Sequence, residues 1–492
     1  MTILQIMLHC LLPCLALANE ASDQKLADNG SAYSLIQIVP NTNENIELLR
    51  YLQTNINVNG MDFWSLPTNV GKTVLVLVHP ELNNPFKDLL NQRNMTNNVM
   101  TMNIGKMIDD ERKQLATEKK RFASSEEATS AQSKGQYPFN LFTFNTLADI
   151  DNYTTHISEN TANYNPIPGL NVSKHSIGTT HEGRSINMLR ISLNEGKKKA
   201  AVWLDCGAHS REWISPAFCL YSIDQLVRHP EELLSMYDFY IVPVVNPDGY
   251  EYTWIERNDV RCQEWPCRLW RKNRQPTKGS GKSRFRSEKE FSWRKRFQEV
   301  MKHFPGIPVN QQLSGGLPSI SAQELGEREV PRTFRGRRSS DGAWKFYSRS
   351  TCLGTDVNRN FDMDWATSGS SDDPCTDIFH GASPFSEKES KAVRNATLLI
   401  NSTQKIAAAV SVHAYSQLWL YPYGTMKRVS SHSADLDRVA SKSVSALSSL
   451  YDTKYRYGQI WKILDPTGNY QAGGNSIDWA HDKVIKLYIN EN

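Results

Sequence analysis

Apolar and polar residues alternate in two distinct ways along the first part of the chain. Residues 33–39 alternate as a half-buried strand does, and residues 72–79 form an apolar run bounded by polar residues. Between them, residues 43–55 carry apolar side chains at helical spacing, with asparagines available as caps. These patterns predict a small α+β unit over residues 31–110.

A second and larger unit begins near residue 139, where the apolar content rises. Residues 200–204 and 239–245 are near-continuous apolar runs, which are typical of strands covered on both faces. Stretches with helical spacing alternate with such runs, at residues 216–227, 386–401 and 433–450. The order predicts an α/β fold, with a mixed, mostly parallel twisted sheet flanked by helices, preceded by the small α+β domain.

Two segments interrupt this alternation. Residues 109–131 are polar and contain the basic run Lys119-Lys120-Arg121, which is either a solvated helix face or a site for a trypsin-like processing protease. Residues 276–350 are rich in Gly, Ser and Arg, with few apolar residues outside 291–304. Because so long a segment without regular pattern is unusual inside a domain, it predicts an irregular insertion.

The first residues have the pattern of a secretory signal. Residues 3–17 are mostly apolar and end in Ala16-Leu17-Ala18, which predicts a signal peptide over residues 1–18. No later stretch reaches the roughly 20 apolar residues of a membrane span. Six Asn-x-Ser/Thr triplets agree with a secreted, extracellular protein without a membrane partner: Asn29, Asn94, Asn152, Asn171, Asn395 and Asn401.

Composition and charge narrow the function classes. The chain has 492 residues, of which 39% are hydrophobic and 22% charged, which excludes a wholly disordered chain and a coiled coil. The formal net charge is +4. Residues 276–350 alone hold 16 Lys or Arg and 7 Asp or Glu, so the remainder of the chain is acidic. We therefore expect no nucleic-acid partner.

The cysteines fit the same compartment. Two of the eight, Cys10 and Cys14, fall in the predicted signal peptide, and an even number in the rest of a secreted chain predicts three disulfides. Nearest-neighbour pairing is the simplest of the possible connectivities. The chain has no Cys-x-x-Cys spacing, which argues against a zinc-thiolate site.

Candidate metal ligands follow two of the predicted strands. His209-Ser-Arg-Glu212 comes directly after the strand at 200–204, and His413 comes after the apolar run at 406–410. Two imidazoles and a carboxylate form a catalytic zinc site when a fourth position stays open. His-x-x-Glu by itself is common, so the competing interpretation is a His and a Glu in a surface loop.

Four further motifs accompany these ligands: Asn246-Pro-Asp-Gly249, Trp270-Arg-Lys-Asn-Arg274, Thr355-Asp-Val-Asn-Arg-Asn-Phe361, and the segment from Tyr470 through two glycines to Trp479. With His209-Ser-Arg-Glu212 they occur in the order found in one family. From about residue 139 the chain resembles the zinc metallocarboxypeptidases of the pancreatic carboxypeptidase A/B type. Residues 31–125 resemble the activation propeptide of that family.

The resemblance implies a secreted zymogen with a signal peptide at 1–18, an activation propeptide at 19–121 and a zinc carboxypeptidase domain at 122–492. It implies one bound zinc ion and removal of the propeptide by a trypsin-like protease at the basic run. The substrates would be the C-termini of peptides and proteins, and the protein would be a monomer.

The resemblance also assigns roles. His209, Glu212 and His413 match the zinc ligands, Asp356 matches the carboxylate that orients a ligand histidine, and Arg274 matches the group that stabilises the oxyanion. Asn358 and Arg359 match residues that bind the terminal carboxylate of the substrate, and Arg211 and Arg271 match auxiliary substrate-binding arginines. Tyr470 matches a mobile tyrosine that closes over the terminal residue of the substrate. The pairs Cys206–Cys219 and Cys352–Cys375 match disulfides of the family. For Cys262 and Cys267, their proximity in the sequence suggests a local disulfide.

The specificity pocket is expected to be apolar. Ile477 stands where A-type members carry an apolar residue and B-type members an Asp, and Leu420 and Gly424 also resemble A-type residues. An apolar wall favours an apolar or aromatic C-terminal side chain, since a buried unpaired cation is costly. Asp465 either approaches this pocket and pairs with a basic side chain, or caps a turn in solvent.

The chain departs from the family at two places. The insertion at 276–350 lies where the family has a short loop. It is either a translated intron or a real insertion. In the register of the family, the general-base Glu corresponds to position 492, which is an asparagine in this chain. Glu491 lies one residue earlier, so its side chain would face the opposite side of a strand. We therefore expect a truncated version of an active design, with a non-catalytic zinc- or peptide-binding relative as the alternative.

Overall fold

The computed structural model describes residues 33–485, except for residues 57–59, 66, 102, 195, 257–258, 260, 263–266, 278–292, 303–336, 339–343, 346–351, 426–427, 452 and 465–470. Several predictions lie outside the described residues: the signal peptide, Asn29, most of the insertion, Asp465, Tyr470, Glu491 and Asn492. The chain forms two compact units. The small unit comprises described residues within 30–102 and 279–352, and the large unit those within 103–278 and 353–492.

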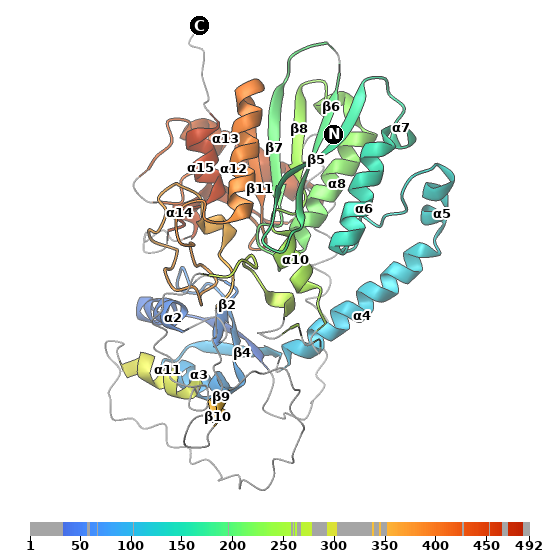
Figure 1. The fold of residues 1–492 in the computed structure, drawn as a ribbon. Helices are drawn as coiled ribbons and strands as arrows, with labels where there is room; N and C mark the ends of the chain where they lie inside the picture. The colour runs from blue at the N-terminus through green and yellow to red at the C-terminus, as the bar shows by residue number, and fades with distance from the viewer. Residues whose placement is uncertain are drawn as a thin grey trace. The chain divides into compact units, whose positions relative to one another are not determined.

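The small unit contains an antiparallel four-stranded sheet in the order β2-β3-β1-β4, with β1 Ser34–Val39, β2 Met61–Phe63, β3 Val74–Val78 and β4 Thr96–Thr101. Helices α2 (Asn43–Asn55) and α3 (Asn83–Gln92) complete the predicted α+β pattern (Figure 1). The side chain of Thr42 accepts a hydrogen bond from the Asn45 backbone amide, so a threonine caps the start of α2 where the sequence predicted an asparagine.

One helix of the insertion belongs to this small unit. Helix α11 (Trp293–Lys302) coincides with the apolar part of the insertion, and it joins the core of the unit. Two short paired strands, β9 (Arg337–Arg338) and β10 (Trp344–Lys345), are the other described elements of the insertion. The predicted irregular segment therefore contains an ordered helix where its sequence becomes amphipathic.

The large unit is built on a mixed five-stranded sheet in the order β11-β7-β8-β6-β5. Its strands are β5 (Leu170–Thr179), β6 (Ser185–Leu193), β7 (Ala200–Cys206), β8 (Tyr237–Val242) and β11 (Ile406–Val412). β7 runs parallel to both β8 and β11, whereas β6 is antiparallel to β5 and β8. The predicted α/β class is confirmed.

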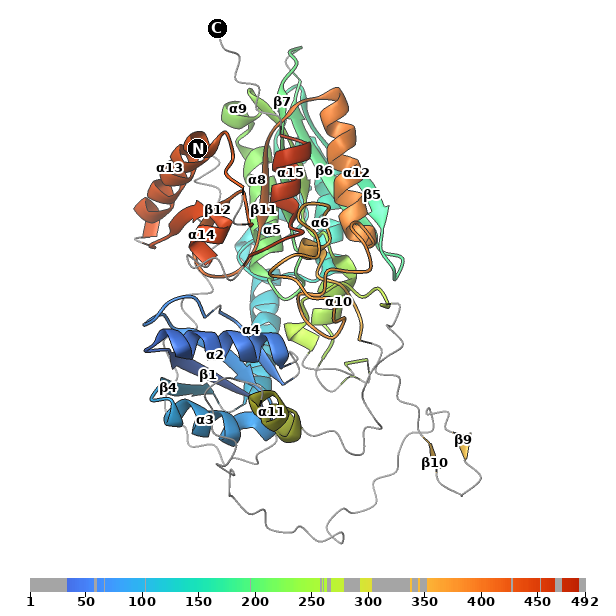
Figure 2. The ribbon, with the colours of Figure 1, turned by 90° about the vertical axis from the view of Figure 1, so that its left-hand side faces the viewer.

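Helices cover both faces of this sheet (Figure 2). One apolar cluster joins α6 (Leu147–Glu159), α8 (Ile214–Arg228) and α13 (Ser433–Tyr451) to the face that carries Val202 and Leu204. A second cluster joins α12 (Lys388–Thr403) and α15 (Ser476–Lys483) to the face that carries Ala201 and Trp203. Because neighbouring residues of β7 face opposite layers, the whole strand is apolar.

Apart from the long helix α4 (Ile104–Ala123), the remaining elements of the large unit are shorter. They are α5 (Glu126–Ser133), α7 (Thr161–Tyr164), α9 (Pro230–Leu233), α10 (Pro247–Thr253), β12 (Leu418–Tyr421), β13 (Arg456–Gln459) and α14 (Ile460–Leu464), with 3₁₀ turns at Cys267–Leu269 and Val357–Arg359. Among the described helices, none combines the length and the hydropathy needed to cross a membrane.

The basic run lies on helix α4 (Ile104–Ala123), which belongs to the large unit. The ion pair of Glu111 with Arg268 has an oxygen–nitrogen distance of 2.8 Å, and Arg112 donates to the carbonyls of Thr253 and Ile255. With these contacts, the boundary between the two compact units falls at residues 102–103, whereas the propeptide boundary at 121 stays a prediction. The basic run is therefore exposed and helical, and its cleavage stays a prediction.

The cysteines of the described chain are paired. Disulfides join Cys206 at the end of β7 to Cys219 in α8, and Cys262 to Cys267. Cys352 and Cys375 are disulfide-bonded as well. The first bond ties a strand that leads into the candidate site to the helix that follows it.

Candidate active site

The two candidate histidines meet because their strands are parallel neighbours. Cys206, the last residue of β7, pairs with Val412, the last residue of β11, so the chain leaves both strands at the same edge of the sheet. His413 follows β11 directly and His209 follows β7 by three residues. Gly207 makes the intervening turn with a φ of 66°, a left-handed conformation that favours glycine.

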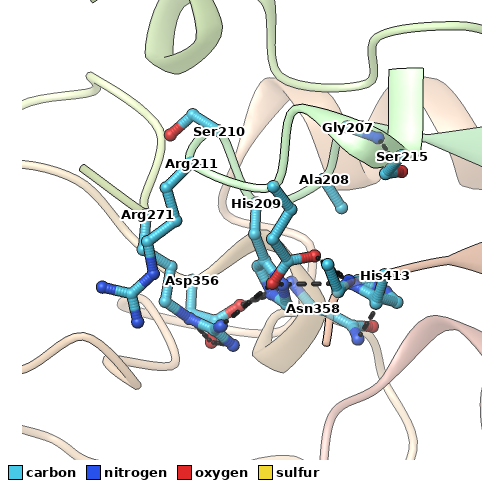
Figure 3. Close-up of polar contacts among 12 residues, drawn as sticks. Gly207, Ala208, His209, Ser210, Arg211, Ser215, Arg271, Asp356, Asn358 and His413 are labelled. Carbon is cyan, nitrogen blue, oxygen red and sulfur yellow. Dashed lines mark hydrogen bonds and ion pairs between the residues drawn. The ribbon is translucent and has the colours of Figure 1, made fainter. Parts of the chain in front are cut away.

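Glu212 completes a compact donor set just before helix α8. Its Oε1 lies 2.8 Å from Nδ1 of His209, and its Oε2 lies 3.1 Å from Nδ1 of His413. The two Nδ1 atoms are 3.0 Å apart (Figure 3). His209 and Glu212 are buried and His413 is half-buried, so the set is open on the His413 side.

This donor set fits a zinc ion. One ligand atom from each of the three side chains lies within 4.8 Å of the others. Two ring nitrogens and a carboxylate that face one point are the N and O ligands that zinc takes in catalytic sites. With three protein ligands, a fourth position remains for water or substrate.

The other ring nitrogen of His209 contacts a buried carboxylate. Its Nε2 lies 3.0 Å from Oδ1 of Asp356, which also accepts a hydrogen bond from the Asn358 amide. Arg271 binds the second oxygen of Asp356 through Nε and Nη2, at 3.2 and 2.8 Å. Asp356 therefore fixes which nitrogen of His209 faces the donor set, and Arg271 holds Asp356 in turn.

His413 is oriented by a hydroxyl and an amide. Its Nε2 lies 3.2 Å from Oγ of Ser411 and 3.3 Å from Nδ2 of Asn358. Ser411 donates to Oδ1 of Asp205, a fully buried carboxylate of β7. The sequence predictions did not include Ser411 and Asp205. Ser411 could have been found, since residues two apart on a strand share a face.

Local charges set the protonation of these carboxyls. Burial acts to raise the pKa of Glu212, but His209 and His413 outweigh it and hold that pKa well below its usual range. Burial likewise opposes ionisation of Asp356, and Arg271 together with His209 lowers its pKa strongly. Both groups are thus anions, as metal ligation and histidine orientation require.

Arg271 reaches the site because its loop is fixed by Asn273. The backbone amide of Asn273 donates to the Thr355 carbonyl, and its side-chain oxygen accepts from the Thr355 amide. Its Nδ2 donates to the buried carboxyls of Glu387 and Glu389, at 2.8 Å each. These bonds hold Arg271 beside Asp356, the residue that follows Thr355. Burial raises the pKa of Glu389 to about 7.

The structure places two of the predicted arginines outside the donor set. The guanidinium of Arg274 lies over the Tyr252 ring, 3.7 Å from its centroid, and its nearest carboxylate oxygen belongs to Glu182, 3.7 Å away. Arg211 pairs with Asp377 at 3.2 Å. Arg271 is the arginine beside the ligands, because its Nη1 lies 3.6 Å from Oε1 of Glu212.

The predicted carboxylate clamp borders the site. Asn358 contacts His413, and its Oδ1 accepts from the Ser476 amide at the start of α15. Arg359 is buried and donates from Nε to the Gly369 carbonyl at 2.8 Å. Gly474, with a φ of 74°, packs on the Arg359 carbonyl so closely that a Cβ would overlap it.

The predicted pocket residues lie on neighbouring segments. Ile477 is half-buried in the first turn of α15, and Leu420 is half-buried in β12. The Gly424 amide donates to Oδ2 of Asp478, the residue after Ile477, at 2.7 Å. Burial raises the pKa of Asp478 to about 7. Gly424 and the start of α15 are therefore brought together.

Known families match both units. Residues 167–489 match the zinc carboxypeptidase family, and residues 36–111 match the carboxypeptidase activation peptide. Bovine carboxypeptidase B is 30% identical over 438 residues, which cover 87% of this chain and 78% of the relative. Rat carboxypeptidase A2 is 28% identical over 459 residues, which cover 92% and 84%.

Solved structures agree with these matches. Thrombin activatable fibrinolysis inhibitor superposes with a TM-score of 0.61 at 26% identity, covering 92% of this chain and 89% of that chain. Carboxypeptidase A from Helicoverpa armigera superposes with a TM-score of 0.66 at 22% identity, covering 93% and 87%. At 22% identity, the similarity to the Helicoverpa armigera enzyme shows a shared fold only.

Proposed function

Because the chain belongs to the zinc carboxypeptidase family, we propose that it hydrolyses the last peptide bond of peptides and proteins and releases single apolar or aromatic residues. The observation that carries this proposal is the convergence of His209, Glu212 and His413 at the carboxyl ends of two parallel strands. These side chains would hold one zinc ion.

Zinc in such a site polarises a carbonyl and lowers the pKa of a bound water. The chain's own contribution is to keep the ligands oriented and charged. Asp356 holds the ring of His209, and Ser411 with Asn358 holds the ring of His413. Residues that fix ligand rings in this way affect metal affinity and activity about 10- to 100-fold.

Arg271 is the group that we assign to the oxyanion. Its Nε and Nη2 are committed to Asp356, while its Nη1 lies beside Glu212 at the edge of the donor set. A guanidinium held this way needs no reorganisation to donate to a substrate oxygen that develops charge. Arg274, which the resemblance assigns to this step, lies over the rings of Tyr252 and Trp270, and its role there stays a prediction.

Asn358 and Arg359 would bind the substrate's terminal carboxylate. Asn358 reaches the donor set through His413, and Arg359 follows it in the same 3₁₀ turn. A guanidinium can donate two parallel hydrogen bonds to a carboxylate, which restricts substrates to chain ends. Ile477 would line the pocket for the last side chain and favour apolar groups there.

The small unit would act as the activation peptide of a secreted zymogen. The match to the activation peptide family, residues 36–111, covers its described residues from 36 to 101. The basic run on α4 is exposed, with Lys119 bound to Asp149 and Arg121 to Glu118 on the surface. Cleavage after Arg121 by a trypsin-like protease would cut the chain into residues 19–121 and 122–492.

Peptides that differ only in the last residue test this function. With the propeptide cleaved, we expect kcat/KM to be higher for peptides ending in Phe or Leu than for those ending in Arg or Lys. Ile477→Asp should reverse that order, because the introduced carboxylate would pair with the basic side chain of the substrate's last residue. Amidated versions of the same peptides are the control, and they should resist hydrolysis since they lack the terminal carboxylate.

Two outcomes would contradict the proposal. A higher kcat/KM on Arg or Lys peptides that Asp465→Ala abolishes would show that Asp465, not Ile477, sets specificity. Zinc and peptide binding without any product would instead support the non-catalytic relative, the second candidate, which is favoured by an asparagine at position 492, where the family's general base is expected.

A further inference from the structure

Helix α11 brings residues of the inserted segment into the core of the small unit. Phe297, Val300 and Met301 are buried there, and Trp293 packs against the same cluster. These residues are spaced four, three and one apart, so they form one apolar stripe along the helix. Lys295, Gln298, Glu299 and Lys302 are exposed. The helix is thus amphipathic, and its apolar side packs into the core of the small unit.

Specific contacts accompany this burial. The Tyr51 hydroxyl in α2 donates to the Val300 carbonyl at 3.2 Å. Glu81 accepts a hydrogen bond from the Arg294 amide at the start of α11, where a carboxylate also interacts favourably with the helix dipole. A Cβ at Gly60 would lie 2.6 Å from the Trp293 ring. Glycine at position 60 therefore leaves the space that this ring occupies.

The order of the chain gives these contacts a consequence. The small unit's sheet and helices α2 and α3 precede the basic run at 119–121, whereas α11 follows it by more than 150 residues. A cut at the basic run therefore leaves α11 covalently joined to residues 122–492. The core that α11 completes is on the other fragment.

We propose that α11 keeps the activation peptide bound to the enzyme after the basic run has been cut, so that a single cut does not separate the two fragments. This inference rests on the proposed function in one respect only, the position of the natural cleavage site. A stripe of apolar side chains that completes a domain core also favours a real insertion over a translated intron.

Cleavage at an engineered site tests the retention without relying on the natural protease. Residues 119–121 of the full chain are replaced by the recognition sequence of a sequence-specific protease, because trypsin would also cut the 16 Lys and Arg of residues 276–350. After complete cleavage, we expect both fragments to elute together in size-exclusion chromatography. Phe297→Ala with Met301→Ala should weaken retention roughly 100-fold. The matched control is Gln298→Ala on the exposed side, which should retain the fragment.

A second form of the protein leaves every α11 contact intact. Recognition sequences on both sides of α11, within residues 279–290 and 305–335, allow the protease to excise the helix together with the small unit. We then expect the activation peptide, with α11, to elute apart from the remaining fragments. Separation after the single cut, or co-elution after all three cuts, would overturn the proposal. Neither readout depends on zinc, on peptide hydrolysis or on cleavage at the natural run.

Discussion

Arg271→Ala is expected to lower kcat about 100- to 1,000-fold, with a smaller change in KM. Removing a donor that stabilises a developing oxyanion costs about 3 to 4 kcal/mol of transition-state stabilisation. Arg271 is assigned to that position because its guanidinium joins Asp356 and lies 3.6 Å from Glu212 through Nη1. The measurement is steady-state kinetics on a Phe-terminated peptide, with zinc content determined on the same sample.

Two variants separate this role from a purely structural one. Arg274→Ala is the matched control from the same loop, and it should retain kcat within about tenfold because Arg274 stacks on Tyr252. Arg271→Lys keeps a charge beside Asp356 but loses the fork, so it should recover part of kcat. An Arg274→Ala variant as slow as Arg271→Ala, or loss of zinc in Arg271→Ala that accounts for its slow turnover, would contradict the assignment.

Asn360→Ala is expected to destabilise the large unit by about 4 kcal/mol, because it leaves several buried partners unsatisfied. Asn360 is fully buried, and its Nδ2 donates to the carbonyls of His380 and Ser383 and to Oγ of Ser386. Its Oδ1 accepts from the Glu387 amide and the Ser390 hydroxyl at the start of α12. Urea unfolding would measure the change in free energy.

An exposed asparagine on α12 supplies the comparison. Asn395→Ala, in protein made without glycosylation, should change the free energy of unfolding by less than about 0.5 kcal/mol. Equal effects at positions 360 and 395 would mean that the network around Asn360 does not fasten the start of α12. The network also lies next to Arg359, so activity should fall with stability in Asn360→Ala.

The sheet was predictable from local apolar patterns, whereas the metal ligands were predictable only because several motifs occur together in the order of one family. An apolar run such as residues 200–204 forms a strand covered on both faces, and parallel strands present their following residues at one edge. The sequence shows only that His209 and His413 each follow a predicted strand, and the ligand set rests on the family resemblance; the structure places their Nδ1 atoms 3.0 Å apart.

Side-chain direction in loops was not predictable in the same way. Arg271 and Arg274 lie three residues apart in one irregular segment, and nothing in their spacing says which one faces the ligands. The choice depends on Asn273, whose bonds to Thr355 set the path of the loop. The position of α11 was missed for a similar reason, since its apolar stripe shows that it must be covered but not by what.

The central claim is that His209, Glu212 and His413 together hold one zinc ion, and metal analysis of the purified chain tests it most directly. The account predicts about one zinc per chain in the unmodified protein and less than about a tenth of that after His209→Ala together with His413→Ala, because a single carboxylate cannot hold zinc tightly. Zinc retained at full stoichiometry in the double variant would contradict it.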